Sequence, residues 1–343
     1  MRKISSGNMP LTPDTTSSKC QNSLWRDSLF GKINIRRQIE LNSQFHESTR
    51  QSMAWVSECG INLSPTIHQE FSKLVSLSSR SQSIKTNTAL TNLVAWLFVR
   101  DDQIDNKMEV MSSSASAIQV YNQRQEKILN GALPQQLPIE IGLYNYMSEL
   151  KKSGQSTHHT AISFKKYFKS NAWEVNNRIK KLHPPIEQYL EFREHTSATQ
   201  PFIESRLILE NISLSDDVRN DILFRRLYRL CGFIVGIGND LFSIGKEMDT
   251  DHGENLILVD MKHNKIPPRI ALQNTVDRIN MWWDEFDDLK NQFLRDTPSH
   301  TPEYKVIQFM EELMSGNFHW SAGTPRYKYV HPELLVNSKI PNA

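Results

Sequence analysis

The sequence has little glycine and almost no net charge. Glycine accounts for 13 of the 343 residues, about half of its average ~7% share, which disfavours glycine-rich phosphate loops and β-folds with many glycine turns. Lysine and arginine number 40 against 38 aspartates and glutamates, a formal net charge of +2. A protein with that balance has no excess positive charge for binding a phosphate backbone, so we expect no nucleic-acid partner.

Long apolar runs and paired cysteines are also absent. The longest apolar stretch, Leu230 to Gly238, spans nine residues, whereas a membrane-spanning helix needs roughly 20. The three cysteines, Cys20, Cys59 and Cys231, lie far apart without metal-ligand or redox spacing. This usage indicates a reducing environment. We therefore expect a cytoplasmic protein without an integral membrane span.

Helical periodicity dominates the rest of the chain. Apolar residues recur every three or four positions, and neither strand-like alternation nor an internal repeat is visible. The sequence therefore predicts an all-α fold. Breaker clusters predict helix boundaries at residues 111–117, 134–138, 151–159, 183–185, 200–201, 248–254 and 323–325.

No cluster of proline, glycine or serine is long enough to resemble a linker between domains. We therefore expect a single domain over residues 24–335, with a short C-terminal tail over 336–343. The polar segment 1–23 lacks the apolar region of a secretory signal. It is predicted to be a disordered tail, and a weak organelle-targeting peptide is the alternative.

An acidic pentad, DDQID, extends one apolar helical face. Asp101 lies four residues after Leu97 of that face, and Asp105 lies four after Asp101; each step of four turns only about 40° around a helix. Both carboxylates therefore point inward, where they repel each other unless a cation joins them. Hard oxygen ligands of this kind suit Mg²⁺, whose coordination is often completed by substrate phosphates. A solvated acidic cluster is the alternative.

A second set of oxygen ligands is predicted further along the chain. Asn239 lies four residues after Val235 on an inward-facing stripe, and Ser243 and Glu247 follow at further steps of four. An amide, a hydroxyl and a carboxylate are thus stacked over two turns, as in a tridentate Mg²⁺ site made by one helix. The alternative is an ordinary serine at the edge of the core and a glutamate near a helix end.

Three of the scarce glycines fall in this same predicted helix. Gly232, Gly236 and Gly238 should each destabilise it by about 1 kcal/mol relative to alanine. Close helix packing or room for a cavity would explain their presence.

In their order and separation, the two motifs resemble those of class I terpene synthases of the microbial, single-α-domain type. DDQID resembles the aspartate-rich motif of that family, and Asn239, Ser243, Lys246 and Glu247 resemble its second motif, ND-x-x-S-x-x-x-E, in the form that ends Lys-Glu. The resemblance implies a helical barrel around a central cavity and an isoprenyl diphosphate substrate. It also implies three Mg²⁺ ions, with Mn²⁺ as a substitute, and a contact from Lys246 to the diphosphate.

The resemblance extends to an arginine upstream of the second motif. Arg193 lies 46 residues before Asn239, at the position of the arginine that senses the diphosphate in the family. Thr196 and Ser197 match the linker and the carbonyl-presenting effector that help to induce ionisation. A buried ion pair is the alternative role for Arg193.

The C-terminal segment resembles the family's Trp-x5-Arg-Tyr element. By this resemblance Arg326 and Tyr327 close over the diphosphate, while Trp320 and Phe98 line the pocket, where their rings would attract a cation. Plain core packing is the alternative for both aromatic residues. Asp102 is turned about 100° from its neighbour in the acidic motif, so we expect it to support a ligand rather than bind metal.

The activity implied is ionisation of an isoprenyl diphosphate, with farnesyl diphosphate preferred for a single α-domain of this size, followed by cyclisation to a sesquiterpene and release of diphosphate. A chain-elongating isoprenyl diphosphate synthase is one alternative, although that family carries a second aspartate-rich motif where this chain has Asn239, Ser243 and Glu247. A non-catalytic helical isoprenoid-binding protein is the other. The protein is expected to be a monomer or a homodimer.

Overall fold

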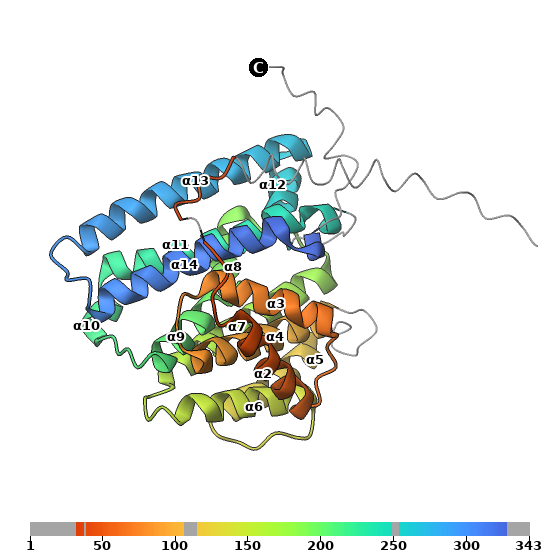
Figure 1. Ribbon diagram of the computed structural model, residues 1–343. Helices are drawn as coiled ribbons and strands as arrows, with labels where there is room; N and C mark the ends of the chain where they lie inside the picture. The colour runs from red at the N-terminus through yellow and green to blue at the C-terminus, as the bar shows by residue number, and fades with distance from the viewer. Residues whose placement is uncertain (1–31, 38, 106–114, 249–253, 328–343) are drawn as a thin grey trace, which may run out of the picture.

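The computed structural model describes residues 32–37, 39–105, 115–248 and 254–327. Within these ranges the chain is helical and contains no β-strand (Figure 1), so the predicted all-α class is confirmed. The predicted tails, 1–23 and 336–343, lie outside the described residues. The helices are α2 (Phe45–Glu58), α3 (Pro65–Ser78), α4 (Ile84–Asp105), α5 (Ala115–Leu129), α6 (Pro138–Lys151), α7 (His158–Lys180), α8 (Ile186–Thr196), α9 (Thr199–Leu209), α10 (Asp216–Asn220), α11 (Ile222–Glu247), α12 (Leu256–Asn264), α13 (Pro268–Phe293), α14 (Pro302–Gly323) and the 3₁₀ helix η2 (Pro325–Tyr327).

Local sequence signals explain where several helices begin. The side chains of Ser64, Asp221 and Thr301 accept hydrogen bonds from backbone N–H groups in the first turns of α3, α11 and α14. These residue types satisfy N–H groups that have no partner inside a helix. Pro65 and Pro302 follow two of the caps, at the position where a missing N–H does no harm.

Most predicted boundaries coincide with helix ends. The boundaries at 111–117 and 248–254 fall partly outside the described residues, and four others are confirmed: 134–138, 151–159, 183–185 and 323–325. The break placed at 200–201 is wrong by a few residues, because the chain turns at Ser197 and Ala198, where Ala198 adopts the left-handed conformation (φ 54°, ψ 18°). Pro201 lies in the first turn of α9, where the helix needs no N–H donor.

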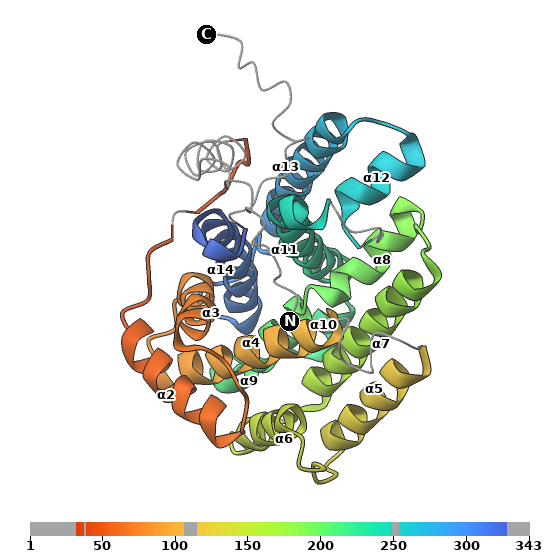
Figure 2. The same cartoon turned by 90° about the vertical axis from the view of Figure 1, so that its right-hand side faces the viewer.

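Seven of the described helices form a closed ring, in the order α3, α4, α9, α7, α8, α11 and α14, with each packed against the next. Figure 2 views this ring from one end. Outside it, α2 packs on α3 and α4, α5 packs on α7, and α13 covers α11. One hydrophobic core connects the inner and outer helices. The ring surrounds the region that several of the predicted site residues face.

The apolar segment noted in the sequence belongs to α11. By length and composition, this helix alone among the described helices could cross a membrane, but 83% of its most apolar window is buried inside the protein. That burial is typical of the central helix of a folded core, and Figure 2 shows α11 enclosed by α8, α13 and α14.

Glycine permits the closest helix contacts in the ring. A Cβ atom at Gly316 of α14 would overlap the carbonyl oxygen of Leu77 at the end of α3, and one at Gly238 of α11 would lie 2.7 Å from the ring of Phe318. Both separations are shorter than van der Waals contact allows. The spacing of α14 from α3 and from α11 therefore depends on the absence of a side chain at these two glycines.

The substitution Gly316→Ala should push α14 away from α3. We expect it to lower the free energy of unfolding by about 1–3 kcal/mol, the usual effect of overpacking a core, and to lower the thermal midpoint measured by circular dichroism. Gly323→Ala is the matched control, because Gly323 lies on the same helix with no atom within 4 Å of its added Cβ. Equal destabilisation by both substitutions would contradict this explanation.

Candidate active site

A pocket lies inside the ring and is lined by residues of α3, α4, α7, α8, α9, α11 and α14. Part of its wall is apolar and aromatic: Leu74, Val94, Leu97, Phe202, Val235 and Leu313. The sequence-predicted residues that line it are Phe98, Asp101, Arg193, Thr196, Ser197, Asn239 and Trp320. The fold thus brings together predicted residues that lie 222 positions apart in the chain, from Phe98 to Trp320. It also places polar groups beside an apolar cavity.

Arg193, in the last turn of α8, has partners on two helices. Its Nε donates to a carboxylate oxygen of Asp240 (3.0 Å), and Nη1 donates to Thr196 Oγ1 (3.1 Å). Its Nη2 donates to the carbonyl oxygen of Gly236 (3.0 Å) and to Asn239 Oδ1 (3.1 Å). Arg193 therefore lines the pocket. It also forms a buried ion pair with Asp240, which was the alternative role predicted from the sequence.

Asp240 is a functional candidate that sequence reasoning missed. Its side chain is buried, and it accepts hydrogen bonds from Tyr189 Oη (2.6 Å) and the backbone N–H of Leu256 (3.0 Å) as well as from Arg193. Although burial alone would lower the pKa of Arg193, the adjacent Asp240 raises it, so the guanidinium remains charged. The sequence does place Asp240 directly after Asn239 in the second motif. The helix, however, turns the Asp240 side chain about 100° away from the side chain of Asn239.

The glycines of α11 allow α8 to lie against it. A Cβ at Gly232 would be 2.9 Å from the carbonyl oxygen of Glu194, and one at Gly236 would be 3.3 Å from Arg193 and from Ser197. These two glycines therefore serve close helix packing, one of the two roles expected from the sequence. As a result, the end of α8 and the break after it lie directly beside the second motif.

The second motif is arranged as predicted along one face of α11. Ser243 Oγ donates to Glu247 Oε2 (2.9 Å), and Nδ2 of Asn255, which precedes α12, donates to the same oxygen (2.8 Å). With the amide oxygen of Asn239, these groups offer the hard oxygen donors that Mg²⁺ prefers. Asp101 contributes a carboxylate from α4 to the pocket, while the side chain of Asp105 lies outside the described atoms.

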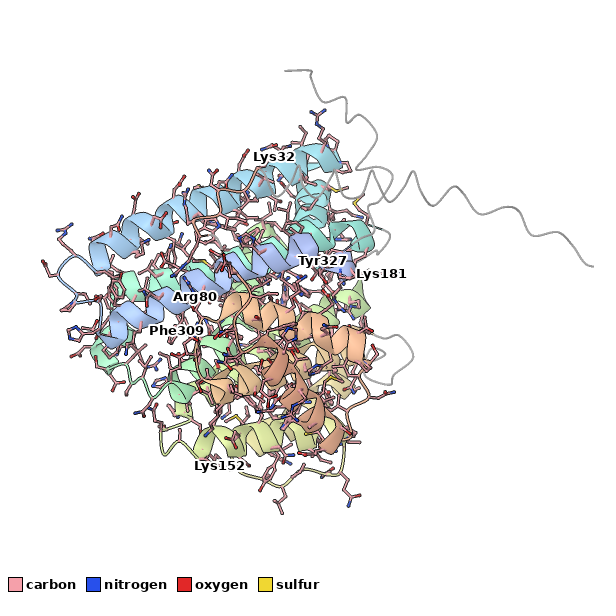
Figure 3. The ribbon with its side chains drawn as sticks, viewed as in Figure 1. Lys32, Arg80, Lys152, Lys181, Phe309 and Tyr327 are labelled. Atoms are coloured by element: carbon pink, nitrogen blue, oxygen red, sulfur yellow. The ribbon has the colours of Figure 1, made fainter. Side chains whose placement is uncertain are left out.

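The Arg-Tyr element joins the two motif helices. Arg326 Nη2 donates to Asp102 Oδ1 of α4 (3.0 Å), and Tyr327 Oη accepts a hydrogen bond from Asn239 Nδ2 of α11. The ammonium of Lys246 lies 6.0 Å from the centre of the Tyr327 ring. Figure 3 labels Tyr327, which lies just beyond the C-terminal end of α14. Asp102 is thus turned toward Arg326.

Three aromatic rings, two of which line the pocket, pack against one another beside it. Phe98 stacks on Phe71 with ring centres 4.2 Å apart, and it lies 5.8 Å from the ring of Trp320. The indole Nε1 of Trp320 donates to the carbonyl oxygen of Glu70 (2.8 Å), which fixes the ring in place. The guanidinium of Arg326 lies 5.1 Å from the centre of the Phe98 ring. Ring faces held in this way can stabilise a positive charge.

Glu174 of α7 is a second pocket residue that the sequence did not single out. It lines the pocket together with Asp101 and Arg193, and Asn171 Nδ2 lies 3.5 Å from Glu174 Oε2. Burial raises the pKa of Glu174 from its ordinary 4.5 to about 8, with the nearby carboxylate of Glu254 adding to the effect. No motif marks this residue, since its importance comes from its neighbours in space.

The chain is similar to known microbial enzymes. It is 24% identical to (+)-eremophilene synthase of Sorangium cellulosum over 292 residues, which are 81% of this chain and 86% of that protein. Identity to germacrene A synthase of Nostoc punctiforme is 22% over 289 residues, covering 80% and 88%. The structure of 2-methylisoborneol synthase from Streptomyces coelicolor, in complex with Mg²⁺ and geranyl-S-thiolodiphosphate, has the same fold, with a TM-score of 0.76 at 14% identity over 87% and 97% of the two chains.

The family model described as terpene synthase family 2, C-terminal metal binding, matches residues 92–285. These residues are more than half of the chain. They include the parts of α4 and α11 that carry the acidic motif and the Asn239 set, together with the whole of α8. The chain therefore belongs to the terpene synthase family, and the protein is a terpene cyclase, a lyase.

Proposed function

We propose that this terpene cyclase ionises farnesyl diphosphate in an Mg²⁺-dependent reaction and cyclises the carbocation to a sesquiterpene, releasing diphosphate. The observation that carries the proposal is that Asp101 of α4 and Asn239 of α11, one residue from each proposed ligand set, line an apolar pocket that Arg193 also faces. The similar proteins named for eremophilene and germacrene A, both sesquiterpenes, support the choice of farnesyl diphosphate. The protein is further proposed to be a cytoplasmic monomer or homodimer.

The oxygen ligands fit the proposed metal. Asp101 and Asp105 on α4, with Asn239, Ser243 and Glu247 on α11, would hold three Mg²⁺ ions, and Mn²⁺ would substitute. When bound, these ions act as Lewis acids toward the leaving diphosphate. Ser243 and Asn255 already hold the carboxylate of Glu247 in one orientation, so one ligand is fixed before metal arrives.

Four cationic or hydroxyl side chains are proposed to bind the diphosphate. Arg193 presents a planar guanidinium suited to a pair of phosphate oxygens. The other three are Arg326, Tyr327 and Lys246, whose ammonium lies 6.0 Å from the Tyr327 ring. They neutralise the charge that develops on the leaving group as the allylic C–O bond breaks. Asp102 positions Arg326 through their ion pair.

The break after α8 contributes the remaining polar groups. Thr196 is proposed as the linker, because its hydroxyl accepts a hydrogen bond from Arg193. Ser197 is proposed as the effector whose carbonyl faces the substrate at the turn formed with Ala198. Phe98 and Trp320 then stabilise the carbocation in a pocket whose apolar wall excludes bulk water.

The substitutions Asp101→Ala and Glu247→Ala each remove one proposed ligand. We expect each to lower Mg²⁺-dependent diphosphate release by about 100-fold or more, as for other losses of charge stabilisation in a transition state. Asp284→Ala is the control: Asp284 is an exposed carboxylate of α13 that pairs with Arg36, and its loss should leave turnover unchanged. Full turnover in both ligand variants would contradict the assignment.

The substrate is tested with geranyl, farnesyl and geranylgeranyl diphosphate. With Mg²⁺, farnesyl diphosphate should give the highest rate of diphosphate release and a cyclic C15 product identified by mass spectrometry. Products that form only after a homoallylic co-substrate is added would instead identify a chain-elongating synthase. Binding without diphosphate release would identify a non-catalytic isoprenoid-binding protein.

The raised pKa of Glu174 predicts that the stability of the metal-free protein depends on pH. Because its pKa rises from 4.5 to about 8, the folded state holds this proton more tightly than the unfolded chain does. The stabilisation is complete below about pH 4.5 and is lost as the pH rises through about 8. Between about pH 5 and pH 9, the thermal midpoint of Glu174→Gln should therefore fall less than that of the wild type. Equal slopes would contradict a raised pKa.

A further inference from the structure

Two polar groups lie in the apolar part of the pocket and have no part in binding metal or diphosphate. They are Asn317 on α14 and Ser78, the last residue of α3. Asn317 precedes Trp320 by three residues, about 4.5 Å along the helix. Since Trp320 contacts the Tyr327 ring at 5.8 Å, Asn317 lies on the side of Trp320 away from the Arg-Tyr element, next to the apolar Leu313.

Within the described residues, neither Asn317 Oδ1 nor Ser78 Oγ has a hydrogen-bond partner. Among the pocket-lining residues that the structure describes, Asn317 Oδ1 and Ser78 Oγ are the two buried side-chain polar atoms that lack one. The residues are 7% and 0% exposed. Leaving such atoms unpaired is unfavourable, and proteins commonly satisfy them with an ordered water.

The close contact at Gly316 places the two residues in one patch. The missing Cβ of Gly316 would lie 2.6 Å from Ser78 Oγ, and Asn317 is the next residue on α14. The same glycine that sets the distance between α3 and α14 therefore brings an amide and a hydroxyl to the same part of an otherwise apolar wall.

We propose that Asn317 and Ser78 hold a water molecule that ends the cyclisation by attacking the carbocation, so that the protein makes a cyclic terpene alcohol. The inference rests on the proposed function. A water that donates its two O–H groups to Asn317 Oδ1 and Ser78 Oγ keeps its lone pairs free to face the cavity. Without this water, the cation would lose a proton and give a hydrocarbon.

The step balances without an oxidant or reductant. A lone pair of the water oxygen forms the C–O bond to the cationic carbon and gives a protonated alcohol. The extra proton then passes to the diphosphate that the same reaction releases, which leaves a neutral alcohol and protonated diphosphate. The oxygen of the product therefore comes from solvent and not from the substrate.

The test is turnover of farnesyl diphosphate with Mg²⁺ in H₂¹⁸O, with products analysed by mass spectrometry and normalised to diphosphate released. The wild type should give a cyclic alcohol carrying ¹⁸O. Asn317→Leu should lower the ratio of cyclic alcohol to hydrocarbon about tenfold, and Ser78→Ala should lower it about threefold, in the range expected for losing one hydrogen bond. If one of the two variants fails to fold, the other still tests the proposal.

Ser315→Ala is the matched control. Ser315 is buried on the same helix with an unpartnered hydroxyl, but it does not line the pocket, so its loss should leave the ratio unchanged. Hydrocarbon as the sole wild-type product would overturn the proposed water while leaving the cyclase function intact. An alcohol ratio unchanged in both pocket variants would also overturn it. Absence of diphosphate release from every substrate would overturn the proposed function itself, and this inference with it.

Discussion

The buried ion pair between Arg193 and Asp240 is the interaction on which the site depends. It links the end of α8 to the middle of α11, and Tyr189 adds a hydrogen bond to the same carboxylate. Removing one member of such a pair leaves an uncompensated buried charge, which is strongly destabilising. The pair therefore fixes the orientation of the guanidinium at the pocket.

Glycine makes that arrangement sterically feasible. Gly232 and Gly236 let α8 approach α11 so closely that an added Cβ atom would lie 2.9 Å and 3.3 Å from carbonyl oxygens of α8. Gly316 likewise permits the close approach of α14 to α3. In a chain with so few glycines, these positions determine the spacing of the ring. The cavity thus takes its shape from the absence of side chains at helix crossings as well as from the residues that line it.

The parts of the site that depend on local geometry could be predicted from the sequence. Steps of four along one helix placed Asn239, Ser243 and Glu247 on one face without knowledge of the fold. Glu174 could not be found in this way, because the residues around it in the pocket come from helices far apart in the chain. Asn255 could not be found either, because it lies beyond the end of α11, where steps of four along the helix no longer apply. The helix break was misplaced for a different reason. Pro201 suggested the end of a helix, but a proline is equally compatible with the first turn of the next one.

The cations of the site already have anionic partners within the protein. Arg193 pairs with Asp240, Arg326 with Asp102 and Lys246 with Glu247. In the proposed reaction, diphosphate would compete with these carboxylates for the cations, and metal would compete with Lys246 for Glu247, which is the one proposed metal ligand among the three carboxylates. At the Lys246–Glu247 pair each ligand would release the group that the other binds, so the two affinities would be coupled, and by thermodynamic linkage that coupling would be equal in both directions. In the ligand-free protein, the charged side chains of the site therefore neutralise one another.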